Sequence, residues 1–332
     1  MTGDTPLLEV TGLKKYFPIH GGVFLRRVGW VYAVDNLSFT IPVGRTLGLV
    51  GESGCGKTTV GRCILRLHAP TAGRITFNGQ DMARLNRAGL RRTRKEIQVI
   101  FQDPFESLNP RHTVEYILEE PYRIHHLGDR EQRKKNVKSL LDRVGLPAGA
   151  ADRFPHEFSG GQRQRLGIAR AIALSPRLII CDEPVSALDV SIQSQILNLL
   201  LELQEEMGFA YLFIAHDLAV VRHISDMVAV MYLGKIVEIT DADTIYQTPR
   251  HPYTRVLIAA IPVPDPTAVK KDKPVSGDVP SPSEPPPGCR FHTRCPYAIA
   301  RCRLEEPPLT QPTEDTNGRE HLVACHRAEE LA

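Results

Sequence analysis

Apolar residues along this chain fall into short runs that alternate with helical patterns. Residues 47–50, 178–181 and 211–215 are continuously apolar, which is typical of strands buried on both faces of a parallel sheet. Residues 192–207 carry apolar side chains at helical spacing, and Gly208 follows them as a residue that commonly ends helices. This alternation of strand and helix patterns predicts an α/β fold.

Shorter β-prone runs near the start of the chain predict a smaller antiparallel β subdomain. Residues 31–34 and 37–41 have this character and are followed by a Pro-Val-Gly turn signal. Residues 18–30, which include a Gly-Gly pair and the sole Trp, are interpreted as a loop insertion. Later in the chain, residues 227–231 and 235–239 flank a Leu-Gly pair and predict a hairpin.

Residues 103–175 change the pattern again and predict an α-helical subdomain inserted into the α/β core. Thr113 is suited to cap a helix with apolar residues on one face. A second amphipathic stretch covers residues 137–144, and Gly145 suits its end. A third helix is predicted from Gly160 onward.

Prolines and cysteines dominate the last part of the sequence. We predict a main domain over residues 1–261, a proline-rich linker over residues 262–288 and a cysteine-rich extension over residues 289–332. Four of the seven cysteines lie in this extension, at Cys289, Cys295, Cys302 and Cys325. In a reducing compartment such clustering suggests a metal site more than disulfides, and four thiolates can hold an iron–sulfur cluster or Zn²⁺. The neighbouring His292, His321 and His326 are expected to be exposed.

Composition and charge narrow the class of protein. The formal net charge of +3 over 332 residues is small, so a polyanion partner is not implied, and the local basic runs are interpreted as solvated helix faces. No apolar stretch approaches the roughly 20 residues that cross a bilayer. The N-terminus lacks the pattern of a secretory signal, so we expect the chain in the cytoplasm.

A glycine-rich loop predicts a nucleotide site. Residues 51–58 read Gly-Glu-Ser-Gly-Cys-Gly-Lys-Thr and lie between a predicted strand and a helix that starts near Thr58 and carries Val60, Ile64 and Leu67 on one face. Glycines allow backbone N–H groups to surround phosphate oxygens, and the helix dipole adds positive potential. The Lys at position 57 would neutralise the β- and γ-phosphates, and the Thr hydroxyl would bind Mg²⁺.

Two further motifs complete the expected chemistry. Asp182 and Glu183 end an apolar strand, where open α/β sheets bind their ligands. Asp182 would hold Mg²⁺ through water, and Glu183 would polarise the attacking water. Residues 158–162, Phe-Ser-Gly-Gly-Gln, place Ser159 as a helix cap before two glycines, which builds another anion site from backbone N–H groups.

In this order, the motifs resemble those of ATP-binding-cassette ATPases over roughly residues 7–260. Residues 51–58 and 182–183 match the Walker A and Walker B motifs. Gln102, in Phe-Gln-Asp-Pro, resembles the Q-loop glutamine, and residues 158–162 resemble the signature motif, with Phe in place of the commoner Leu. The D-loop aspartate and the switch histidine fall on Asp189 and His216.

The resemblance implies roles for these side chains. Glu183, His216 and Gln102 would carry hydrolysis, and Thr58, Gln102 and Asp182 would surround Mg²⁺. The adenine would stack on Phe17, with Tyr16 as the alternative. The other contacts to ATP would come from Gly51, Glu52, Ser53, Gly54, Cys55, Gly56, Lys57, Thr58, Thr59, Ser159, Gly160, Gly161, Gln162 and Asp189.

A closer resemblance, to oligopeptide and dipeptide importer ATPases, rests on residues 251–255 (His-Pro-Tyr-Thr-Arg), the insertion near residues 21–22 and the tail at residues 288–296. The insertion resembles that of the second of the two ATPase types in such importers. The tail resemblance favours a [4Fe–4S] cluster over Zn²⁺. Related importers of nickel or other small solutes, and a soluble cassette protein acting on nucleic acid or ribosomes, are the alternatives.

The resemblance also implies partners and a location. Two ATPase subunits would enclose two ATP molecules, with Ser159 and Gly161 acting on the partner's nucleotide. The implied partners are two transmembrane permease subunits, a second and non-identical ATPase subunit and, indirectly, an extracytoplasmic peptide-binding protein, with no nucleic acid. The implied location is peripheral, on the cytoplasmic face of the plasma membrane.

Overall fold

The computed structural model describes residues 6–102, 108–261, 277–312 and 320–331. The chain divides into two compact units. The first comprises Met1–Ile41, Thr46–Ala83 and Ala215–Ala332, and the second comprises Pro42–Arg45 and Arg84–Ile214. Both contain helices and strands, so the predicted α/β class is confirmed.

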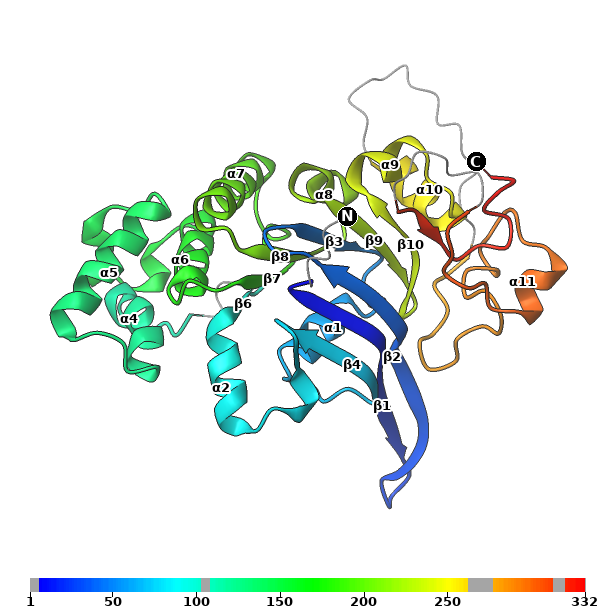
Figure 1. The fold of residues 1–332 in the computed structure, drawn as a ribbon, viewed down its shortest axis with the longest axis horizontal. Helices are drawn as coiled ribbons and strands as arrows, with labels where there is room; N and C mark the ends of the chain where they lie inside the picture. Colours follow the sequence, from blue (N-terminus) through cyan, green and yellow to red (C-terminus); the bar gives the residue numbers. More distant parts are fainter. Residues whose placement is uncertain (1–5, 103–107, 262–276, 313–319, 332) are drawn as a thin grey trace. The chain divides into compact units, whose positions relative to one another are not determined.

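An antiparallel sheet forms the early part of the first unit. Its strands lie in the order β2-β1-β4-β5, with bounds β1 Leu8–Gly21, β2 Arg26–Ile41, β4 Ala72–Phe77 and β5 Gln80–Asp81. Strands β1 and β2 form a long hairpin, and Ile19 pairs with Gly29 near its tip (Figure 1). The prediction of a loop over residues 18–30 is therefore wrong for most of that range. The hairpin end is largely exposed, so burial imposes no apolar alternation on its sequence.

The first unit also contains the strands that carry the glycine-rich loop and the tail. Strand β3 (Thr46–Val50) pairs in parallel with β9 (Met227–Tyr232), which forms the predicted hairpin with β10 (Lys235–Asp241). Strand β11 (Leu322–Val323) adds to β10 from the far end of the chain. The helices of this unit are α1 Lys57–Ile64, α8 Leu218–Ile224, α9 Ala242–Gln247, α10 Pro252–Ala259 and α11 Ala300–Leu304. The expected apolar face of α1 is only partly correct, because Leu67 lies beyond the helix and is 53% exposed.

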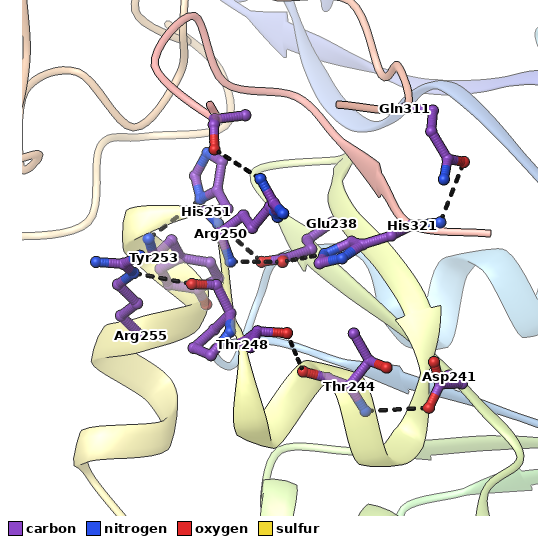
Figure 2. A network of polar contacts seen from close by, with 12 residues as sticks. Glu238, Asp241, Thr244, Thr248, Arg250, His251, Tyr253, Arg255, Gln311 and His321 are labelled. Atoms are coloured by element: carbon purple, nitrogen blue, oxygen red, sulfur yellow. Dashed lines mark hydrogen bonds and ion pairs between the residues drawn. The ribbon is translucent and has the colours of Figure 1, made fainter. Parts of the chain in front are cut away.

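A buried carboxylate fastens the C-terminal region to the sheet. Glu238 on β10 is fully buried and accepts hydrogen bonds from the backbone N–H groups of Arg250 and His251, at 2.8 and 3.0 Å, and from Nε2 of His321 at 2.8 Å (Figure 2). The Arg250 guanidinium donates to the carbonyl of Ala328. Because a buried carboxylate is stable only with such donors, this network ties the tail to the fold. The prediction that His321 is exposed is wrong.

His251 makes the stability of this region depend on pH. Burial lowers the pKa of His251 to about 4, although the Glu238 carboxylate acts in the opposite direction. The neutral Nδ1 accepts the N–H of Tyr253 at 3.1 Å and thereby caps α10. In the unfolded chain, His251 binds a proton once the pH falls below its ordinary pKa of 6.5. In the folded chain, it stays neutral until the pH falls to about 4. The contribution of this group to stability is therefore complete above pH 6.5 and falls by about 3 kcal/mol as the pH drops to 4.

The variant His251→Asn tests this dependence, because asparagine caps a helix without titrating. The free energy of unfolding is measured in urea at pH 7.5 and at pH 4.5. Between these two pH values, the wild type is expected to lose about 2–3 kcal/mol more of this free energy than the variant. Equal losses in the two proteins would show that His251 does not titrate in the fold.

The second unit carries the parallel strands β6 (Ile97–Ile100), β7 (Leu178–Asp182) and β8 (Ala210–Ala215) in the order β8-β7-β6. Every residue of β8 and all but the last residue of β7 are buried, as the continuous apolar runs at residues 178–181 and 211–215 predicted. The helix predicted over residues 192–207 is α7, Val190–Met207, and it ends at Gly208. Helix α2 (Arg87–Glu96) precedes β6.

The predicted helical subdomain is present in the second unit. Helices α4, α5 and α6 contact one another, and Thr113 caps α4 through the N–H of Tyr116. Helix α5 ends just before Val144, and Gly145 follows with the positive φ typical of a helix end. The bounds are α4 Val114–Ile124, α5 Arg130–Arg143 and α6 Gly160–Ile172, with short 3₁₀ turns at Ala148–Asp152 and Pro155–Glu157.

Candidate nucleotide-binding site

The glycine-rich loop connects β3 to α1 in the first unit, as predicted. Gly56 caps α1 with φ 110°, and Lys57 begins the helix. The Lys57 side chain is nearly buried, and its ammonium donates to the carbonyls of Gly51 and Glu52 at 2.7 and 3.0 Å. This ammonium and the N-terminus of α1 concentrate positive potential at one end of the loop, which suits a phosphate.

The aromatic residues proposed to stack on adenine lie on β1, also in the first unit. The hydroxyl of Tyr16 donates to Asp35 at 2.6 Å, so this side chain has a structural partner. The half-buried ring of Phe17 packs edge-on against His68, and the ammonium of Lys15 lies 4.8 Å from its centroid. The occupied hydroxyl of Tyr16 favours Phe17 as the stacking residue, which remains a prediction.

His216 follows β8 directly and belongs to the first unit. Its side chain is exposed, and the next residue, Asp217, caps α8 by accepting the N–H of Ala219 at 2.7 Å. A buried strand on one side and a capped helix on the other therefore fix the backbone at His216. This is the context expected for the predicted switch histidine, whose role in hydrolysis remains a prediction.

The second unit brings Gln102 and Glu183 together. Glu183 follows β7 and has a positive φ of 49°, which is uncommon for a residue with a side chain. Its N–H donates to the carbonyl of Ile214 at 2.9 Å, and its carboxylate accepts a hydrogen bond from Nε2 of Gln102 at 3.2 Å. A strained backbone held in this way is typical of functional positions. Asp103 and Pro104 of the same motif lie outside the described residues.

The signature segment forms the expected capped helix. Ser159 Oγ accepts the N–H of Gln162 at 3.4 Å, and Oε1 of Gln162 accepts the N–H of Ser159 at 3.0 Å. Gly160 and Gly161 form the first turn of α6 between these partners. The amide of Gln162 thus has a local structural partner, and the predicted contacts of these four residues with a nucleotide remain predictions.

Gln193 supports the segment between Glu183 and Asp189 and was missed by the sequence analysis. Its Nε2 donates to the carbonyls of Val185 and Leu188, both at 3.0 Å. Asp189 itself is exposed at the start of α7. No motif signalled this role, because a glutamine inside a helix is ordinary until the fold turns it toward a neighbouring loop.

The predicted Mg²⁺ ligands have suitable chemistry. Thr58 lies in the first turn of α1, and Asp182 is the last residue of β7. Both are half-buried, and with Gln102 they offer hydroxyl, carboxylate and amide oxygens. Mg²⁺ prefers such hard oxygen ligands, so the oxygen atoms of each of these residues suit the ion.

The cysteine-rich tail does not show the predicted metal site. Across the part of the chain that the structure describes, no group of three or more His, Cys, Asp or Glu side chains is arranged to hold a metal ion. Burial raises the pKa of Cys289 to about 12 and that of Cys325 to about 11, and nearby cysteines add to both shifts. Cys295, Cys302 and Cys325 thus act on the thiol of Cys289, but the described residues show no iron–sulfur or zinc site.

Two residues of the C-terminal region contact the glycine-rich loop within the first unit. The hydroxyl of Tyr253 accepts the N–H of Glu52 at 2.9 Å, and the guanidinium of Arg294 donates to its carboxylate at 2.9 and 3.1 Å. Both residues belong to segments that carried the family resemblance, but no motif in the sequence indicated this contact.

Together, the loop on α1, the acidic pair after β7 and the capped signature helix define the ATPase of an ATP-binding cassette. The chain belongs to the ABC transporter family: residues 34–186 match the family described as "ABC transporter". Within this family it carries the tail of a particular group, because residues 237–302 match the region described as "Oligopeptide/dipeptide transporter, C-terminal region".

Curated relatives match almost the whole chain. The oligopeptide transport ATP-binding protein AppF of Bacillus subtilis is 54% identical over 323 residues, which cover 96% of this chain and 97% of that protein. A probable peptide ABC transporter ATP-binding protein of Sinorhizobium fredii is 54% identical over 320 residues, covering 96% of this chain and 89% of that protein.

Solved structures of ABC proteins match the fold of most of this chain. An ATP-binding cassette in a dimeric, post-hydrolysis state bound to ADP and Pi matches with a TM-score of 0.63 and 28% identity, covering 71% of this chain and 98% of that one. The cbiO1 protein of Clostridium perfringens, part of the ABC transporter complex cbiONQ, matches with a TM-score of 0.63 and 26% identity, covering 73% of this chain and 90% of that one.

Proposed function

We propose that this chain is the ATP-hydrolysing subunit that powers an importer of oligopeptides or dipeptides. The observation that carries the proposal is the match to peptide-transport ATPases over nearly the full length, including the C-terminal region. The local geometry supports hydrolysis, since a buried lysine lies in the phosphate loop and Gln102 is hydrogen-bonded to Glu183.

Each side chain then has a defined task in hydrolysis. Lys57 neutralises the β- and γ-phosphates, and Glu183 orients and polarises the attacking water. His216 contacts the γ-phosphate, and Gln102 reaches Mg²⁺ while it senses the membrane subunit. Thr58, Gln102 and Asp182 would hold Mg²⁺, which when bound would neutralise charge on the phosphates.

Two such subunits enclose two ATP molecules in this proposal. Ser159, Gly161 and the N-terminus of α6 act on the nucleotide held by the partner, because a helix N-terminus with free backbone N–H groups suits a γ-phosphate. Closure of the pair moves the membrane subunits, and hydrolysis resets them. The dimeric state of a solved relative is consistent with this arrangement.

The proposed partners are two permease subunits, a second and non-identical ATPase subunit and, indirectly, an extracytoplasmic peptide-binding protein. Within residues 6–102, 108–261, 277–312 and 320–331, no helix combines the length and the apolar character that a membrane crossing requires. The proposed location is peripheral, on the cytoplasmic face of the plasma membrane, where the chain binds its permease subunits.

Affinity purification from detergent-solubilised membranes tests these partners. The expected result is recovery of two transmembrane subunits and a second ATPase, with ATP hydrolysis stimulated by a peptide-loaded binding protein. Recovery of RNA or ribosomes in their place would favour a soluble cassette protein. Stimulation by nickel and not by peptides would favour a related small-solute importer.

The iron–sulfur cluster remains a separate proposal for Cys289, Cys295, Cys302 and Cys325. The clustering of these four cysteines in the sequence supports it, and burial together with nearby cysteines raises the pKa of Cys289 and of Cys325. Burial favours the protonated form of these thiols. Binding a metal would convert them to thiolate ligands and release their protons. Anaerobic purification followed by iron, sulfide and zinc analysis tests it, and a protein without metal would refute it.

A further inference from the structure

Glu52 is held by the C-terminal region through both its backbone and its side chain. Its N–H donates to the hydroxyl of Tyr253, 201 positions later in the chain. Its carboxylate forms a two-pronged ion pair with Arg294, 242 positions later, through Oε2 at 2.9 Å and Oε1 at 3.1 Å. Parallel N–H···O bonds of this kind fix orientation as well as charge.

The surroundings of Arg294 restrict where its guanidinium can lie. Its side chain is 11% exposed and that of Glu52 is 26% exposed, so the pair is largely shielded from solvent. The guanidinium carbon lies 5.9 Å from the ring centroids of both Tyr232 and Phe291. These rings pack on one another at 5.3 Å and on the ring of Tyr253 at 4.7 and 5.3 Å. A packed aromatic cluster thus fixes the partners of Glu52.

A second arginine fixes the same segment of the tail. Arg290 donates to the carboxylate of Asp35 and to the carbonyl of Leu233 in the turn between β9 and β10. The adjacent Gly234 in turn donates its N–H to the carbonyl of Cys55 in the glycine-rich loop at 2.9 Å. The tail therefore supports the loop at two points, directly at Glu52 and through the β9–β10 turn at Cys55.

The charge of Glu52 makes the direct contact important for a nucleotide. A carboxylate on the loop that surrounds the phosphates opposes their binding unless it is neutralised. Arg294 neutralises the carboxylate of Glu52. The ammonium of Lys57 instead donates hydrogen bonds to the backbone carbonyls of Gly51 and Glu52. Loss of the guanidinium would leave an unpaired, poorly solvated carboxylate beside the triphosphate.

We propose that Arg294 and Tyr253 are positioning residues of the ATP site, which act through Glu52 to shape and neutralise the phosphate-binding loop. The C-terminal region thereby belongs to the machinery of ATP binding as well as to the peptide-importer tail. This inference rests on the proposed role of residues 51–58 in binding ATP.

Equilibrium binding of a fluorescent ATP analogue to the full-length chain tests the proposal. Arg294→Met is expected to raise the Kd about 10–100-fold, because truncating one partner of a shielded ion pair strands the other charge. The double variant Glu52→Gln with Arg294→Met is expected to recover to within about 3-fold of the wild type, because it removes the stranded carboxylate. A tail that had merely become disordered would not be rescued by a change in the loop.

Two controls separate the possible causes. Arg301→Met removes an exposed arginine of α11 that pairs with Glu305, and the Kd is expected to be unchanged. Lys57→Ala is expected to abolish binding. If Lys57→Ala binds ATP like the wild type, the proposed function fails; if Lys57→Ala fails to bind and Arg294→Met binds normally, only the present inference fails.

In the assembled transporter, Arg294→Met is expected to raise KM for ATP while kcat changes less than 3-fold, since in this proposal Glu52 serves ATP binding and Glu183 serves hydrolysis. Should Arg294→Met not fold, Arg294→Lys provides the test: it keeps the charge that neutralises Glu52 but loses the two parallel hydrogen bonds, so its Kd is expected to rise by no more than about 5-fold. A double variant that binds ATP no better than Arg294→Met, or a loss in Arg294→Lys of tenfold or more, would overturn the proposal.

Discussion

Glu183→Gln is expected to bind ATP with unchanged affinity and to hydrolyse it about 10²–10⁴-fold more slowly in the assembled transporter. The amide keeps the size of the side chain and its hydrogen bond with Gln102, but it loses the charge that polarises the attacking water. The positive φ of Glu183 and the bond from its N–H to Ile214 are backbone features, so the substitution preserves them. Single-turnover hydrolysis and equilibrium nucleotide binding measure the two effects separately.

The matched control is Glu205→Gln, which makes the same change on the exposed face of α7. It is expected to leave both binding and turnover at wild-type values. A Glu183→Gln protein that retains more than a tenth of wild-type turnover would remove Glu183 from the role of catalytic carboxylate. In that case the hydrogen bond between Gln102 and Glu183 would no longer be evidence that the catalytic site lies at the end of β7.

Gly56→Ala is expected to abolish ATP binding and to destabilise the first unit by more than about 3 kcal/mol. Gly56 has φ 110°, and a Cβ at this position would lie 2.0 Å from the carbonyl oxygen of Ala33 and 2.9 Å from Cε of Met231. Backbone atoms do not yield as a flexible side chain does, so the loop must move away from Ala33. The amide groups that receive the phosphates would move with it. Thermal unfolding and nucleotide binding check the two consequences.

Gly79→Ala serves as the control for Gly56→Ala. It also places a side chain at positive φ, 75°, but nothing lies within 4 Å of the added atom. Only backbone strain remains, and the expected cost is about 1 kcal/mol with no change in ATP binding. Wild-type thermal stability and ATP affinity in Gly56→Ala would show that the loop does not require its observed conformation.

The sequence predicted the parts of the site that local motifs encode. The loop at residues 51–58, the acidic pair after β7 and the cap at Ser159 each depend on neighbours within a few positions, and each formed where the sequence placed it. The buried strands were also predicted, because burial on both faces leaves a continuous apolar run. The roles of these residues in catalysis remain predictions.

The features that were missed depend on distant partners. Nothing near Arg294 or Tyr253 in the sequence indicates a contact with Glu52, which lies more than two hundred positions away. His321 was expected to be exposed because the sequence shows no partner for it. Its partner, the buried carboxylate of Glu238, lies beside it only in the fold. The hairpin at residues 18–30 was missed because its exposed end carries no alternating pattern. Residues 262–276 of the predicted linker lie outside the described residues, whereas the N–H of Tyr32 bonds to the carbonyl of Pro282 in its later part.

ATP turnover per chain, measured over a dilution series together with the oligomeric state of the same samples, tests the central claim that two ATPase subunits complete each site. Turnover is expected to fall as the subunits separate and to recover when the partner ATPase is added. Full turnover by the dilute chain alone, unchanged by any partner, would contradict the claim.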